Sequence, residues 1–256
     1  MRGFWSVYRK ELYSMFASPI FYVVGFVFLV ISGYFYYGAM VFYSRYSFEA
    51  TQDPMAMSYL NVTEMVLRPF FMDISIVLLL IAPLLTMRLY AEERKSGTME
   101  LLFTYPVSDR ATLLAKFGAV ASTLGVILLG TVPSILLLGY IGNPNWAAVV
   151  CGYLGVLLLG GAFMALGAFT SAMTQNQIVA AVLSFGALLM FWVIGWLKSF
   201  VGPTTGSVIS YISITRHFES FSKGVLDLRD LVFYFAFILF FLFLTLRQIE
   251  SYRWRG

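Results

Sequence analysis

The sequence predicts an all-α polytopic membrane protein with six transmembrane helices, and three observations support this fold class. Hydrophobic residues make up 60% of the chain and charged residues only 12%, which is more apolar than a soluble domain. Several apolar runs are long enough to cross a bilayer core of about 30 Å. These runs are continuous and do not alternate with period two, which excludes an outer-membrane β-barrel.

The chain begins with a predicted amphipathic interfacial helix at residues 1–19 that lies on the membrane. Its apolar face carries residues at helical spacing, namely Phe4, Tyr8, Leu12, Met15 and Phe16. Its opposite face carries Arg2, Ser6, Arg9 and Tyr13. The pair Ser18-Pro19 ends this helix, and the run that follows is too long for a cleavable signal peptide.

Six apolar spans follow, with expected boundaries Ile20–Phe42, Met72–Tyr90, Ala111–Ile141, Trp146–Ser171, Ile178–Leu197 and Leu231–Leu246. The first ends in an aromatic cluster, Tyr34–Tyr37, that suits a membrane interface. The turn Gly142–Asn145 joins the third and fourth spans. No soluble domain is visible, so residues 1–256 are expected to form a single transmembrane domain.

The distribution of Lys and Arg predicts that both termini are cytoplasmic. With the N-terminus inside, 11 of the 17 basic residues fall on cytoplasmic segments and 6 on external ones, as the positive-inside rule requires. The expected location is the cytoplasmic (inner) membrane of a bacterium. Two longer segments, 44–71 and 198–230, then face outward, and the second is expected to be amphipathic.

The most unusual segment is a charged island, Ala91–Lys116, between the second and third spans. It carries four carboxylates and four cations, namely Glu92, Glu93, Glu100, Asp109, Arg94, Lys95, Arg110 and Lys116. A loop that only turned the chain at the cytoplasmic surface would be shorter and mostly basic. Mixed charge on a structured loop indicates a docking surface for another protein, and a solvated, salt-bridged loop without a partner is the alternative.

Turn and cap residues predict how the island folds. The second span continues as a helix through Lys95 and stops at Gly97. Thr98 caps a short helix at residues 99–104, with Glu100 in its first turn. Pro106 follows this helix, and Ser108 caps the third span. The short helix is thus held crosswise beneath the membrane, where it can convert a push from below into a tilt of two spans.

Residues 91–108, AEERKSGTMELLFTYPVS, resemble the cytoplasmic signature of ABC transporter permeases of the type-2 exporter class. The matching positions are Glu92, Glu93, Gly97, Thr98, Glu100, Leu101, Pro106, Val107 and Ser108, followed by Lys116. Residues 170–183 are similar to the second cytoplasmic turn of the gliding-motility-associated branch of this class. Residues 217–230 resemble that branch's segment before its last span, so the likeness covers essentially the whole chain.

The resemblance implies a permease that works as a dimer, of identical or different chains, with each protomer docking a separate ATPase subunit. It implies that the N-terminal helix and the coupling loop at residues 91–110, with its coupling helix, form most of the docking surface. The acidic positions Glu92, Glu93 and Glu100 are expected to contact the ATPase. The full set of expected docking residues is Glu92, Glu93, Arg94, Gly97, Thr98, Glu100, Leu101, Pro106 and Ser108.

The sequence contains no G-x-x-x-x-G-K-[ST] phosphate loop. The chain is therefore not expected to be an enzyme, and the partner ATPase is expected to bind ATP and Mg²⁺. No cofactor is expected in this chain.

Two other features have less specific interpretations. The second cytoplasmic turn, with Thr174, Gln175 and Asn176, is either a further contact with the ATPase or a tight solvated turn. Small residues form stripes on the third and fourth spans, at Ala115, Ala119, Ser122, Gly160, Gly161, Ala165 and Ala168. They are expected to pack helices inside the protomer, and a dimer seam is the alternative.

Other classes of function find less support. Charges within the spans are scarce, and Asp73 and Arg88 lie near the ends of the second span, which argues against an ion-coupled carrier. The lone Cys151 allows no internal disulfide, and the single His217 is expected to be structural because no hydrolase motif surrounds it. The basic residues form no nucleic-acid-binding surface.

The sequence therefore favours the membrane-spanning subunit of an ATP-driven ABC transporter, coupled to its ATPase through residues 91–110. The scarcity of buried charge favours export of an amphipathic or lipid-linked substrate. Two alternatives stay open, namely a non-transporting scaffold of an envelope complex for motility or secretion, and an ion-coupled secondary carrier.

Overall fold

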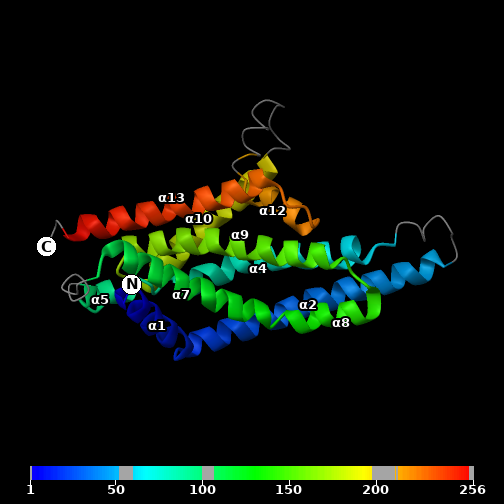
Figure 1. Cartoon of the computed structure of the whole chain (residues 1–256), viewed down its shortest axis with the longest axis horizontal. Coiled ribbons are helices and arrows are strands. Elements are labelled where there is room, and N and C mark those ends of the chain that lie inside the picture. Colours follow the sequence, from blue (N-terminus) through cyan, green and yellow to red (C-terminus); the bar gives the residue numbers. More distant parts are fainter. Residues whose placement is uncertain (1, 52–59, 100–106, 198–210, 212, 254–256) are drawn as a thin grey trace.

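The computed structural model describes residues 2–51, 60–99, 107–197, 211 and 213–253, and these residues form helices joined by short turns (Figure 1). Within these ranges, six helical stretches are long and apolar enough to cross a membrane. They are Pro19–Ala50, Thr63–Lys95, Asp109–Gly142, Trp146–Met173, Gln177–Gly195 and Leu228–Tyr252. The predicted all-α fold with six spans is confirmed, although the first, second and sixth stretches are longer than predicted.

The N-terminal helix α1 (Arg2–Phe16) exists as predicted, but its inner face contacts protein. It packs along α7 (Asp109–Leu129), and its residue Glu11 is buried in this contact. Ser18 then caps α2 (Pro19–Ala50) by accepting a hydrogen bond from the Ile20 N–H. The elbow between α1 and α2 therefore forms where Ser18-Pro19 predicts it.

The second span contains a break. A π-helical turn, η1 (Thr63–Leu67), leads into α4 (Arg68–Thr86), and residues 87–90 form turns before the short helix α5 (Ala91–Lys95). The prediction of one continuous helix up to α5 was wrong, because groups from other helices replace the local hydrogen bonds at this point. Gly97 follows α5 with φ +70°, which is the left-handed, helix-ending conformation predicted for it.

The third span, Asp109–Gly142, confirms the predicted apolar stretch, and the structure divides it into two helices. Helix α7 ends at Leu129, and α8 (Val132–Gly142) begins three residues later. Pro133 has no N–H to donate to the Leu129 carbonyl. A Cβ at Gly130 would lie 2.7 Å from the Leu29 side chain, so the break also brings the chain close to α2.

The core is built around α9. The helices after the third span are α9 (Trp146–Met173), α10 (Gln177–Leu197), α12 (Ile214–Ser222) and α13 (Leu228–Arg253). Helix α9 packs against α4, α7, α10, α12 and α13. A Cβ at Gly160 would lie 2.4 Å from Leu124 Cδ2, and one at Gly167 would lie 2.1 Å from Thr86 Oγ1. Small residues thus let neighbouring helices approach α9 closely.

The two predicted stripes of small residues serve this internal packing. Ala165 and Ala168 of α9 are buried, as are Ala115 and Ala119 of α7. Ser122, the last member of the α7 stripe, lies with its hydroxyl 2.8 Å from the Tyr8 hydroxyl of α1. Helix α1 therefore packs against the small-residue stripe of α7.

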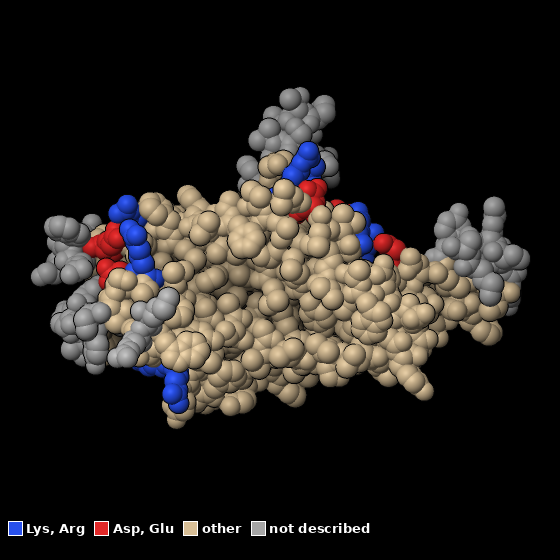
Figure 2. All heavy atoms as spheres, viewed as in Figure 1, with Lys and Arg blue, Asp and Glu red and all other residues tan. Residues whose placement is uncertain are grey.

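The elements of the charged island lie at one end of the bundle. The start of α1, helix α5 and the end of α13 are at this end, whereas α2 and α8 extend to the opposite end (Figure 1). On the face drawn in Figure 2, charged side chains gather at the α5 end and again near α12, with an uncharged belt between them. We call the α5 end the polar end; it comprises α5, the turn at residues 173–177 and the adjoining ends of α1 and α13.

Candidate functional site

The break between α4 and α5 is held by a side chain from α9. The Ser171 hydroxyl oxygen accepts hydrogen bonds from the Tyr90 N–H at 3.1 Å and the Ala91 N–H at 3.2 Å. The same hydroxyl donates to the Met87 carbonyl at 2.9 Å. Side chains that enter a helical hydrogen-bond ladder in this way bend helices. Ser171 therefore accounts for the break and fixes α5 to α9.

A buried ion cluster, formed by Glu11, Glu93 and Lys116, holds the other side of the break. Lys116 Nζ lies 2.9 Å from Glu11 Oε1, from Glu93 Oε1 and from the Leu89 carbonyl oxygen. These three acceptors use all three N–H donors of the ammonium, and the Lys116 side chain is 1% exposed. The cluster joins α7, α1, α5 and the turn before α5.

The surface residue Lys10 balances the charge of the ion cluster. Lys10 Nζ lies 3.7 Å from Glu11 Oε1 and from Glu93 Oε1. Two cations therefore face two carboxylates, which reduces the cost of burying them. Glu93 was expected to contact a partner, but its side chain is turned toward Lys116 and is only 13% exposed.

Arg94 ties α5 to two further helices. Its guanidinium donates to the Ala172 carbonyl at the end of α9 and to the Tyr252 hydroxyl near the end of α13. It also lies 4.0 Å from the centre of the Tyr252 ring, within the range of a cation–π contact. Helix α5 is thus bonded to α1, α7, α9 and α13.

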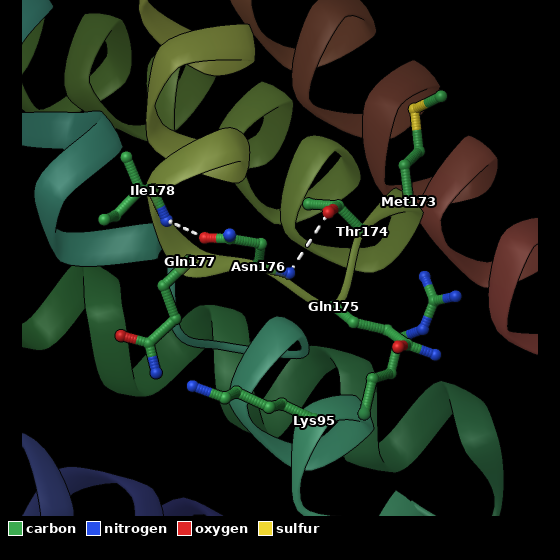
Figure 3. Close-up of a pocket in the computed structure, with 8 residues that line it drawn as sticks. Lys95, Met173, Thr174, Gln175, Asn176, Gln177 and Ile178 are labelled. Atoms are coloured by element: carbon green, nitrogen blue, oxygen red, sulfur yellow. Dashed lines mark hydrogen bonds between the residues drawn. The ribbon is translucent and has the colours of Figure 1, made fainter.

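An open cleft of about 620 Å³ lies between α5 and the turn that follows α9. Its lining residues are Arg94, Lys95, Met173, Thr174, Gln175, Asn176, Gln177 and Ile178. Figure 3 shows Lys95 of α5 on one side of the cleft and the turn with Gln175 and Gln177 on the other. The cleft therefore offers cationic and amide groups.

Local hydrogen bonds make the turn rigid. The Asn176 N–H donates to Thr174 Oγ1 at 3.1 Å, and Asn176 Oδ1 accepts from the Ile178 N–H at 2.9 Å (Figure 3). The second bond caps α10. Gln175 and Asn176 remain exposed, so the turn presents them on a fixed backbone.

The structure brings the two predicted contact regions together, since Arg94 and Thr174–Asn176 line one cleft. Glu92, Gly97 and Thr98 are exposed beside it. Ser108 caps α7 by accepting from the Ala111 N–H at 3.3 Å, as predicted. Of the remaining candidates, Glu100, Leu101 and Pro106 lie outside the described residues, and so does the predicted helix at 99–104 beyond Met99.

Sequence reasoning missed Glu11 and Ser171. Glu11 had a visible signal, because it lies three residues after Tyr8 and four before Met15, on the apolar stripe of α1. A carboxylate on that stripe indicates a buried cation, and Lys116 was available. Ser171 had no such signal, because a serine near the end of a span is common. Within the described ranges, no three His, Cys, Asp or Glu side chains are grouped to hold a metal.

The fold and this site define a multi-pass membrane protein. At its polar end, residues of α1, α7, α9 and α13 hold the second span at its break between α4 and α5. The family model described as ABC-2 family transporter protein matches residues 5–247. The chain therefore belongs to this family, the membrane subunits of ABC transporters, which confirms the prediction of an ABC-2 permease, and the exporter role stays a prediction. The gliding-motility branch stays a prediction. A comparison with curated proteins gives no match.

Proposed function

We propose that the chain is the membrane subunit of an ATP-driven exporter and that its polar end docks the ATPase on the cytoplasmic side. The observation that carries this proposal is the position of α5, which borders an open cleft and is also bonded to four other helices. An element placed in this way can receive a force at the surface and pass it to the membrane-spanning helices. The start of α1 and the end of α13 lie at this end and are then cytoplasmic.

The exposed groups around the cleft suit a protein partner. Lys95, Gln175 and Asn176 can bind an acidic or amide-bearing segment of the ATPase, and Glu92 adds a carboxylate at the rim. Charged and amide groups on a rigid backbone favour specific docking. Glu93 acts differently in this proposal, because its carboxylate holds α5 to Lys116 and transmits the force.

The route of the force follows the bonds of α5. A displacement of α5 pulls on Lys116, and through it on α7 and α1. The same displacement acts on α9 through Ser171 and on α13 through Arg94. Because the helical ladder is interrupted at residues 87–90, α5 can tilt relative to α4 without breaking a continuous helix.

The exposed sides of the bundle are apolar and suit lipid and a second protomer. The apolar windows of α2 and α10 are only 22% and 17% buried within the chain, whereas that of α9 is 72% buried. Helices exposed to this degree need an apolar neighbour. We therefore propose a dimer, and an amphipathic or lipid-linked substrate that moves along the dimer interface.

The test is purification of the tagged full chain from its own host in mild detergent, followed by an assay of ATP hydrolysis. We expect a co-purifying subunit with a phosphate-binding loop and vanadate-sensitive ATPase activity. Lys95→Glu, which reverses an exposed charge in the cleft, should reduce the captured activity. Arg229→Glu, at the exposed start of α13 and away from the polar end, should not. A preparation without any nucleotide-binding partner would favour the scaffold or the secondary carrier instead.

A further inference from the structure

A second cleft, which we call the outer cleft, lies between α2 and the start of α4, away from the polar end. It has a volume of about 430 Å³, within the range of small-molecule sites. Its lining includes Tyr34, Phe35 and Phe42 of α2, and Glu64 and Asp73 from η1 and α4. Gly38 forms part of the same wall, and no heavy atom lies within 4 Å of the position of a Cβ there. The missing side chain helps to keep the cleft open.

Asp73 is a carboxylate that has no counterion among the residues the structure describes. It lies on a membrane-spanning helix and is half-buried, and no hydrogen bond or ion pair joins it to any residue within the described ranges. An ionised carboxylate in apolar surroundings is costly unless a cation neutralises it. A cation bound in the cleft would therefore stabilise the ionised form of Asp73.

The nearby Arg68 does not supply that positive charge. It lies 3.2 Å from Glu64 Oε2 and 3.1 Å from Glu219 Oε1, so its guanidinium already bridges two carboxylates. Lys223 is 2.7 Å from Glu219 Oε1. The charged side chains among the described residues that line the outer cleft are the carboxylates Glu64 and Asp73, so the lining is acidic.

The aromatic wall of the outer cleft adds a second reason to expect a cation. Tyr34 and Phe42 are 72% and 60% exposed, and the Phe35 ring lies 6.0 Å from the Tyr34 ring at an angle of 60°. Aromatic faces attract ammonium groups and also bind apolar groups. A neutral or anionic amphiphile would use the apolar contacts but would leave Asp73 unpaired.

We propose that the outer cleft binds an amphipathic cation, with its charged group beside Asp73 and its apolar body against Tyr34 and Phe42. Two sources share this chemistry, namely the amine headgroup of an aminophospholipid and a soluble lipophilic cation. Binding at this cleft needs no ATPase. Its failure would therefore leave the proposed docking function untouched, and the reverse also holds.

The test measures binding of radiolabelled tetraphenylphosphonium to the purified full chain in a neutral maltoside detergent. We expect saturable binding, and no comparable binding of tetraphenylborate, which has the same shape and the opposite charge. Asp73→Asn should weaken the binding about tenfold, the effect of losing one charged partner. Glu49→Gln is the matched control, because Glu49 is an exposed carboxylate of α2 that does not line the cleft.

A second variant and a lipid arm complete the experiment. Phe42→Ala removes an exposed ring and should weaken binding without affecting the fold. Displacement of the probe by phosphatidylethanolamine, and not by phosphatidylglycerol, would identify a lipid headgroup as the natural ligand, and no displacement by either lipid would indicate a soluble cation. Equal binding of the cation and the anion, or equal binding by the Asp73→Asn and Glu49→Gln variants, would overturn the proposal.

Discussion

The Ser171 hydroxyl stands between the Met87 carbonyl and the Ala91 N–H, the two groups that would bond directly in an unbroken helix. One hydroxyl therefore satisfies both groups and joins α9 to the two sides of the break. The Met87 carbonyl and the Ala91 N–H are thus both paired, although the helix is interrupted. Ser171 thus keeps α5 attached to α9 across the break, and the proposed mechanism uses this break to let α5 change its angle to α4.

Ser171→Ala should loosen this attachment. The substitution leaves the Tyr90 and Ala91 N–H groups and the Met87 carbonyl without their partner, at a cost of about 1–3 kcal/mol in the free energy of unfolding. Hydrogen exchange at Tyr90 and Ala91 should become faster than in the unmodified protein. Ser96→Ala, which removes an exposed hydroxyl at the end of α5, is the control. Equal exchange rates in the two variants would contradict the claim that Ser171 holds the break between α4 and α5.

Lys116→Met should destabilise the protein strongly. It removes the cation shared by Glu11 and Glu93 and leaves two carboxylates with limited access to water, at a cost of about 3–5 kcal/mol. Thermal unfolding in detergent measures the effect. Lys95→Met removes an exposed lysine of α5 and should change the free energy of unfolding by less than about 0.5 kcal/mol. Similar melting temperatures for both variants would mean that the ion cluster does not hold the polar end together.

The neighbours Glu92 and Glu93 should respond differently to charge reversal. Glu92→Arg alters an exposed side chain, so the melting temperature should stay near that of the unmodified protein while capture of the ATPase falls. Glu93→Arg places a third cation beside Lys10 and Lys116, so the melting temperature should fall as well. Measuring both quantities for both variants separates docking from structure. Identical behaviour of the two variants would contradict the assignment of Glu92 to docking and of Glu93 to the ion cluster.

The buried pair of His217 in α12 and Asp230 in α13 gives a fourth prediction. His217 Nδ1 lies 2.7 Å from Asp230 Oδ1, and His217 Nε2 lies 3.0 Å from the Tyr211 carbonyl oxygen. His217→Phe keeps a ring beside Phe233 but leaves Asp230 buried and unpaired, at a cost of about 3–5 kcal/mol. Lys223→Ala breaks an exposed pair with Glu219 and should cost about 0–1 kcal/mol. A His217→Phe protein as stable as Lys223→Ala would show that the buried pair is not structural.

The sequence was sufficient to predict the features that local chemistry determines. Long apolar runs specify the six spans, because backbone groups in lipid must bond within their own helix. Gly97 and Ser108 occupy the cap positions predicted for them, and Ser18-Pro19 ends α1 as predicted, since each acts on residues within one turn of itself. That α5 and the turn at residues 173–177 line one cleft was not predicted, although each region was considered as a contact with the ATPase.

The features that the sequence could not supply depend on residues far apart in the chain. The break before α5 requires Ser171, which lies 80 residues after Ala91. The ion cluster requires Glu11 and Lys116, which are 105 residues apart. Helical periodicity describes one helix at a time, so it cannot indicate which helix supplies a partner. Glu93 therefore looked like a docking residue, although its carboxylate faces the interior.

The central claim is that the polar end docks the ATPase, and site-specific photocrosslinking tests it most directly. A benzoylphenylalanine placed at Gln175, on the exposed turn of the cleft, is compared in whole cells with one at Leu226, which is exposed before α13. The account predicts a crosslink from position 175 to a nucleotide-binding subunit and none from position 226. A crosslink to that subunit from position 226 alone, or from neither position, would contradict it.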